Sequence, residues 1–181
     1  LEEARLTMPE DQYEQEFEVS FQAAVSGAYY GKQIQKAERE DRITDVEYDP
    51  NNDVETWWDL GIGDSTSIWF AQRSGTEIHL IDYLETSGES LAYYVNELEA
   101  KGYNYGRHIA PHDITTRELG TGKSRLEVAR ELGIDFEVCP KLEVHHGIEA
   151  VRNNLDNCWF DKNRCKYGID CLRQYRKQFD D

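Results

Sequence analysis

The chain has 181 residues, of which 39% are hydrophobic and 12% aromatic, so it can bury one sizeable core but hardly two. The 36 acidic and 20 basic residues give a formal net charge of −16, which argues against a general nucleic-acid coat and indicates that any DNA contact must use a local basic stripe. Four cysteines without a CxxC pair, and no signal peptide or long apolar run, predict a reducing cytosolic setting and no membrane segment.

The first part of the chain, residues 1–52, is predicted to be a helical arm or linker that leads into one domain at residues 53–181. Tyr13, Phe17 and Phe21 recur at helical spacing, which predicts an amphipathic helix. The rest of this segment is polar and contains the turn signal YDPNND. We therefore expect the folded core to begin after it.

Three strand-like runs follow, VETWWDL, TSIWFAQ and EIHLIDYLE, and the hairpin sequences GIGDS and RSGT separate them. They predict a three-stranded antiparallel meander. Downstream we expect a helix in SLAYYVNELEAKG, a strand in GRHIAPHD, a helix in KSRLEVARELG, a strand in DFEVCP, and helices in HHGIEAVRNNL and from about Asn163 onward. The predicted fold is α/β: a mixed five-stranded sheet, three antiparallel strands then parallel strands, flanked by helices.

This order of elements predicts that two carboxylates meet at one edge of the sheet. A strand that is joined to its neighbour through a helix normally lies parallel to it, so the fourth strand should lie beside the first. Asp59 ends the first strand and Asp113 follows the fourth, at the strand ends where ligands gather in such sheets. Because like charges repel and are costly to bury, a hard divalent cation, Mg²⁺ or Mn²⁺, is the expected partner.

Two such ions about 4 Å apart would activate a water and stabilise the leaving oxygen of a phosphodiester. Asp64, in the first hairpin, could supply a further ligand or could simply turn the chain. Asp113 could instead cap a helix. Asp82 is a weaker candidate, because an alternating strand would point it to solvent.

The sequence GTGKS is similar to a phosphate-binding loop, but the first glycine of that motif is absent and no strand directly precedes it. We interpret it as the start of a helix. Lys123, Arg125, Arg117 and Arg130 are then candidates for contact with a DNA backbone, and a solvated helix face is the alternative. The histidines have no zinc-type spacing with any cysteine.

Four blocks, AAVSGAYYGKQI, WWDLGIGDSTSIWF, GRHIAPHDITTRELGTGKSRLEVARELGI and CWFDKNRCKYGIDCLRQYRKQF, together resemble the C-terminal nuclease domain of the large terminase subunit of tailed bacteriophages or prophages. The resemblance implies a ribonuclease H-like fold and a metal-dependent endonuclease that cuts concatemeric double-stranded DNA in the cytoplasm of the bacterial host. On the family pattern, Asp59 matches the first catalytic acid, Asp113 the second and Asp64 an auxiliary acid. The implied partners are DNA and, in the full protein, an ATPase domain, the small terminase subunit and the portal.

The sequence departs from the family pattern at both ends. The ATPase motor is missing, and residues 1–52 resemble the segment that connects to it. The third catalytic acid usually follows the LRQYRKQF helix, so we expect it beyond Asp181; the setting of Asp170 matches the helix upstream instead. Two alternatives stay open: a module of this fold that binds DNA or a partner without cutting, and a resolvase- or transposase-like nuclease.

Overall fold

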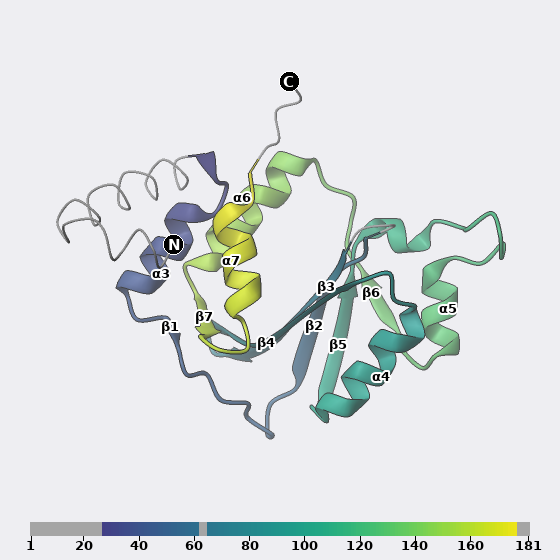
Figure 1. Ribbon diagram of the computed structural model, residues 1–181, viewed down its shortest axis with the longest axis horizontal. Coiled ribbons are helices and arrows are strands. Elements are labelled where there is room, and N and C mark those ends of the chain that lie inside the picture. The colour runs from purple at the N-terminus through teal and green to yellow at the C-terminus, as the bar shows by residue number, and fades with distance from the viewer. Residues whose placement is uncertain (1–26, 62–64, 177–181) are drawn as a thin grey trace, which may run out of the picture.

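The computed structural model describes residues 27–61 and 65–176 as one mixed β-sheet with helices packed on it (Figure 1). The predicted amphipathic helix around Tyr13, Phe17 and Phe21 lies outside these residues. The described elements are α3 (Gly31–Arg39), β1 (Ile43–Thr44), β2 (Val54–Asp59), β3 (Ser65–Ser74), β4 (Glu77–Ser87), α4 (Leu91–Lys101), β5 (Tyr105–Ala110), the 3-10 helix η1 (His112–Thr115), α5 (Arg125–Glu131), β6 (Phe136–Val138), α6 (Val144–Leu155), β7 (Cys158–Asp161) and α7 (Lys166–Gln174).

The sheet has seven strands in the order β1-β7-β4-β3-β2-β5-β6. Strands β2, β3 and β4 form the predicted antiparallel meander, and β5 lies parallel to β2, so the fourth predicted strand does sit beside the first. The mixed α/β sheet is thus confirmed. It is larger than the expected five-stranded sheet because β7 pairs with β4 and β1 pairs with β7, both in parallel. The sequence indicates no strand at either of these two segments, which have two and four residues.

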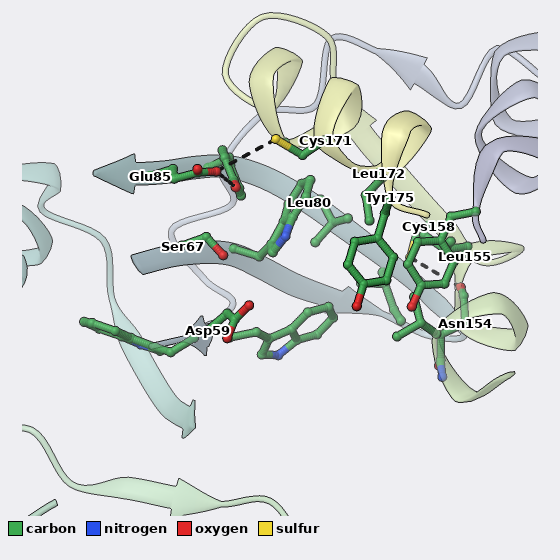
Figure 2. Close-up of a pocket in the computed structure, with 18 of the residues that line it drawn as sticks. Asp59, Ser67, Leu80, Glu85, Asn154, Leu155, Cys158, Cys171, Leu172 and Tyr175 are labelled. Carbon is green, nitrogen blue, oxygen red and sulfur yellow. Dashed lines mark hydrogen bonds between the residues drawn. The ribbon is translucent and has the colours of Figure 1, made fainter. Parts of the chain in front are cut away.

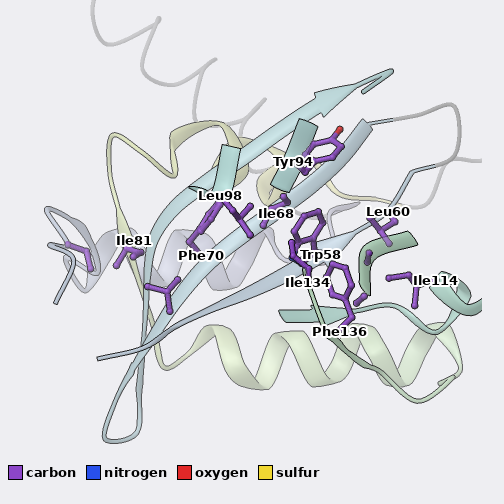
Figure 3. Close-up of a cluster of buried hydrophobic side chains, with 14 residues drawn as sticks. Trp58, Leu60, Ile68, Phe70, Ile81, Tyr94, Leu98, Ile114, Ile134 and Phe136 are labelled. Atoms are coloured by element: carbon purple, nitrogen blue, oxygen red, sulfur yellow. The ribbon is translucent and has the colours of Figure 1, made fainter. Parts of the chain in front are cut away.

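Two hydrophobic clusters lie on the two faces of the sheet. Along β2, Val54, Thr56 and Trp58 are buried on one face and Trp57 lies on the other, because side chains alternate along a strand. Trp58 belongs to the cluster that α4 and α5 cover, where it makes edge-on contacts with Tyr94 and Phe136 (Figure 3). Helices α3, α6 and α7 gather over the other cluster, at the β7 side of the sheet (Figure 1).

Helix α7 approaches the sheet closely at Gly168. A Cβ atom at this position would lie 2.6 Å from Cη2 of Trp69 and 2.8 Å from Cδ2 of Tyr83. Only a residue without a side chain therefore lets α7 pack at this distance.

Within the described ranges, no helix is long and apolar enough to span a membrane.

The described part of the predicted arm packs on the sheet. Helix α3 buries Ile34 and Ala37, and β1 adds an edge strand. The buried Arg42 side chain donates hydrogen bonds to the carbonyl oxygens of Leu155 (3.0 Å) and Cys158 (2.6 Å). The origin of residues 1–52 as a linker from an ATPase domain stays a prediction.

Candidate functional site

Strand register brings Asp59 and Asp113 to the same edge of the sheet. Asp59 is the last residue of β2, and Asp113 lies in η1, directly after β5. In the parallel pairing of these strands Trp57 lies opposite Ile109, so Asp59 is level with Pro111, two residues before Asp113. The two predicted site residues therefore converge, although 54 positions separate them in the sequence.

The electrostatics of this pair favour a bound cation. Asp59 is exposed at the strand end, yet the protein around its carboxyl group removes part of its hydration. This desolvation first, and the charges of Asp113 and Glu85 next, raise the pKa of Asp59 above its usual value. The Oδ1 atom of Asp113 is buried and has no hydrogen-bond partner among the described residues. A repelling carboxylate pair with an orphaned oxygen suits a divalent cation, which prefers oxygen ligands.

The pair has no third protein ligand in the part of the chain that the structure describes. Across residues 27–61 and 65–176, no three His, Cys, Asp or Glu side chains come close enough together to hold a metal ion. Asp64, the predicted auxiliary acid, lies outside the described residues. Its role stays a prediction.

Glu85 is a further acid near the site, and it was not among the predicted site residues. Asp59 pairs with Ser67 across β2 and β3, and Ser67 pairs with Glu85 across β3 and β4. The three side chains form one row across the sheet (Figure 2). The Oε1 atom of Glu85 accepts a hydrogen bond from Ser65 Oγ at 2.7 Å, and Oε2 accepts one from the Tyr83 hydroxyl.

A groove of about 690 Å³ runs from this acidic row along the face of the sheet (Figure 2). Its lining includes six aromatic side chains: Tyr30, Trp57, Trp58, Trp69, Tyr83 and Tyr175. The Tyr30 and Tyr175 rings stack with centroids 5.5 Å apart. Asp59 and Glu85 lie at one end of the groove, so the candidate site has a polar edge and an apolar floor.

Two other acids considered from the sequence have structural roles. The prediction that Asp82 faces solvent is wrong: its side chain is buried and accepts hydrogen bonds from Lys101 Nζ (2.6 Å) and the Tyr103 hydroxyl (3.1 Å). Asp170, on α7, forms an ion pair with Arg173 at 2.7 Å.

The four cations predicted to contact DNA lie on α5 and on the loop before it, and each is paired with a carboxylate. The pairs are Lys123 with Glu131 (2.6 Å), Arg125 with Glu118 (3.4 Å), Arg117 with Glu127 (3.4 Å) and Arg130 with Asp135 (3.0 Å). No free basic stripe is formed there, and DNA contact by these residues stays a prediction.

The GTGKS sequence is a helix start, as predicted. Ser124 is the N-cap of α5: its hydroxyl accepts from the Glu127 backbone, and the Glu127 carboxylate accepts from the Ser124 backbone. This reciprocal capping box satisfies two backbone donors that the helix itself leaves free. The preceding strand ends at Ala110, far from the loop.

The sheet order and the helices that cover it give the chain a ribonuclease H-like fold. Solved structures that are similar to the chain include nuclease domains of phage large terminases. The phage P22 domain is 16% identical, with 77% of each chain covered and a TM-score of 0.58. The phage SPP1 domain, solved with bound Mn, is 18% identical, with 77% of this chain and 73% of that one covered and a TM-score of 0.53.

The match to the large terminase of a thermophilic bacteriophage has a TM-score of 0.57 at 14% identity. It covers 76% of this chain but only 36% of that one, so the chain spans about a third of that protein's length. No protein-family model and no curated protein matches the sequence. The comparisons therefore establish the fold.

Proposed function

We propose that the chain is the metal-dependent endonuclease domain of a phage DNA-packaging terminase large subunit, which hydrolyses phosphodiester bonds of concatemeric double-stranded DNA. The observation that carries the proposal is the convergence of Asp59 and Asp113, with the buried, unpartnered Oδ1 atom of Asp113. Neither carboxylate has a salt-bridge partner within the described ranges, so a cation would neutralise them. The manganese bound to the similar SPP1 domain supports a divalent cation.

Asp59 and Asp113 would hold Mg²⁺ or Mn²⁺, and the chemistry of phosphodiester hydrolysis favours two ions. When bound, such ions supply an activated water and stabilise the leaving oxygen. The two carboxylates contribute the anionic oxygens, and Asp64 would add another from the first hairpin. Solvent and phosphate oxygens would fill the remaining positions, as is usual for Mg²⁺ sites with one or two carboxylates.

The proposed substrate is double-stranded DNA, with Lys123, Arg125, Arg117 and Arg130 on its backbone. Each of these cations would exchange its carboxylate partner for a phosphate. For Lys123, Arg117 and Arg130, whose side chains are exposed, the exchange costs little, because such ion pairs contribute only about 0–1 kcal/mol. In the full protein we propose an ATPase domain, the small terminase subunit and the portal as partners, in the cytoplasm of the bacterial host.

Plasmid cleavage in the presence of Mn²⁺ tests the proposal. We expect Asp59→Asn and Asp113→Asn each to abolish cleavage, because an amide replaces a charged oxygen ligand and keeps its shape. Asp156→Asn is a matched control, since Asp156 is exposed and pairs with Lys36 away from the site. The metal-free melting temperature of the two site variants should be equal or higher, because carboxylate repulsion is relieved. Full cleavage by either variant would refute the site assignment.

A second function, a module that binds DNA or a partner without cutting, is favoured by one observation. The described residues offer two converging acids rather than three. The same experiment separates the two functions, because such a module would retain DNA in a mobility-shift assay and leave the plasmid intact at every Mn²⁺ concentration.

A further inference from the structure

Glu85 faces the proposed metal site because of the register of three strands. Asp59, Ser67 and Glu85 occupy directly paired positions, so they project from the same face of the sheet. Neighbouring strands lie about 4.8 Å apart, which puts the Cα atoms of Asp59 and Glu85 about 10 Å apart. Ser67 lies between them in the row, and all three residues line the same groove (Figure 2).

The Glu85 carboxylate is held in one orientation. Ser65 Oγ donates to one oxygen at 2.7 Å, and the Tyr83 hydroxyl donates to the other. Burial of Tyr83, and then its hydrogen bond to Glu85, raise the pKa of that phenol, so it stays a donor at neutral pH. Cys171 of α7 lies next to the same oxygen, with its Sγ atom 3.9 Å away. Both Glu85 oxygens are therefore engaged by the protein.

The charge of Glu85 is nevertheless not neutralised. No Lys, Arg or His side chain forms an ion pair with it in the described part of the chain. Glu55, on the same face of the sheet, is different, because Arg73 (3.1 Å) and Arg107 (3.2 Å) both pair with it. Glu85 thus leaves a full negative charge about 10 Å from Asp59 along the row, and this charge attracts a cation through space.

We infer that Glu85 is a positioning residue of the proposed metal site: it does not bind the cation itself, and its fixed charge raises the affinity of Asp59 and Asp113 for a divalent cation. The inference rests on the proposed function. Carboxylates outside the first ligands usually tune a metal site through a hydrogen bond to one of the ligands, whereas the partners of Glu85 are Ser65, Tyr83 and Cys171. Glu85 would do so through space, along the row that the strand register builds.

Titration calorimetry of the 181-residue chain with Mn²⁺ tests this role. In Glu85→Gln we expect the Kd for Mn²⁺ to rise about threefold to tenfold, the Coulomb effect on a divalent ion of removing one charge about 10 Å away in a dielectric close to that of water. Glu85→Asp keeps the charge and should stay within about twofold of the unmodified chain. Glu77→Gln is the matched control, because Glu77 lies on the same strand, eight residues or about 26 Å away.

The Mn²⁺ concentration that gives half-maximal plasmid cleavage provides a second reading. In Glu85→Gln it should rise by the same factor as the Kd, whereas in Glu77→Gln it should stay unchanged. An unchanged Kd in Glu85→Gln, or a Kd in Glu85→Asp that is as weak as in Glu85→Gln, would overturn the inference. If the unmodified chain binds no Mn²⁺, the proposed function and this inference fall together. If Asp59→Asn weakens binding and Glu85→Gln does not, this inference alone fails.

Discussion

A substitution at Gly168 tests directly how closely α7 packs on the sheet. In Gly168→Ala the new Cβ would lie 2.6 Å and 2.7 Å from two ring atoms of Trp69 and 2.8 Å from a ring atom of Tyr83. Carbon atoms normally approach to about 3.5–4.0 Å, so the helix or the rings must move. The rings have little room, because Trp69 also packs against Phe160 at 6.0 Å between centroids.

Two opposing contributions determine how far Gly168→Ala changes the free energy of unfolding. Overpacking a well-packed core costs about 1–3 kcal/mol. Replacing a glycine inside a helix by alanine stabilises it by about 1 kcal/mol. Gly147→Ala, in α6, is the matched control, since a Cβ there meets nothing within 4 Å and only the favourable contribution applies. Gly168→Ala should therefore be less stable than Gly147→Ala by about 1–3 kcal/mol.

Thermal melting followed by circular dichroism measures this difference. For a chain of this length 1 kcal/mol corresponds to about 2–4 °C, so the two melting temperatures should differ by about 2–12 °C. Urea denaturation at 25 °C gives the free energy of unfolding independently of the heat-capacity change. Equal stability of the two alanine variants would refute the close seating of α7 on Trp69 and Tyr83.

Two further predictions concern charged groups. Calorimetry should detect no ATP binding at micromolar affinity, because Ser124 of the GTGKS sequence caps α5. Lys123→Ala should weaken DNA binding and reduce the slope of log K against log salt concentration by about one. An unchanged slope would mean that Lys123 lies on a solvated helix face. Burial acts to raise the pKa of Asp161, but hydrogen bonds from Arg164 and Val46 outweigh it and hold the pKa below its ordinary value of 3.8. The folded carboxyl group thus binds its proton less tightly than the unfolded one, so this stabilisation is complete above that value and is lost as the pH falls through the folded pKa. Asp161→Asn should be less stable at pH 7 and lose less stability on acidification below about pH 4, and parallel pH profiles of the two proteins would contradict this.

The parts of the fold that could be predicted are those with a local signal. The turn sequences between the strands indicate the meander, and helices α4 and α6 are long enough to show the helical spacing of their apolar residues. Strand β7 has only four residues, and its pairing with β4 comes from tertiary contacts that no local pattern records. Helix α3 is polar except for Ile34 and Ala37, so its packing on the sheet could not be read from its composition.

The convergence of Asp59 and Asp113 could be predicted because it depends only on strand order and on parallel crossovers. The position of Glu85 could not. Regular pairing from the turn of the β3–β4 hairpin would place Leu84 opposite Ser67. A bulge in β4, where the register shifts between Phe70 and Ala71 of β3, places Glu85 there instead.

The same bulge explains why the prediction for Asp82 is wrong. Strict alternation would turn Asp82 toward the groove, but the extra residue turns it to the opposite face, where it pairs with Lys101. A one-residue shift exchanges the two faces of a strand, and bulges are common beside functional sites because they re-aim side chains in this way. In this sheet the shift buries one acid in an ion pair and turns another, Glu85, toward Asp59. The acidity of the proposed site therefore depends on one residue of backbone register as much as on the acids themselves.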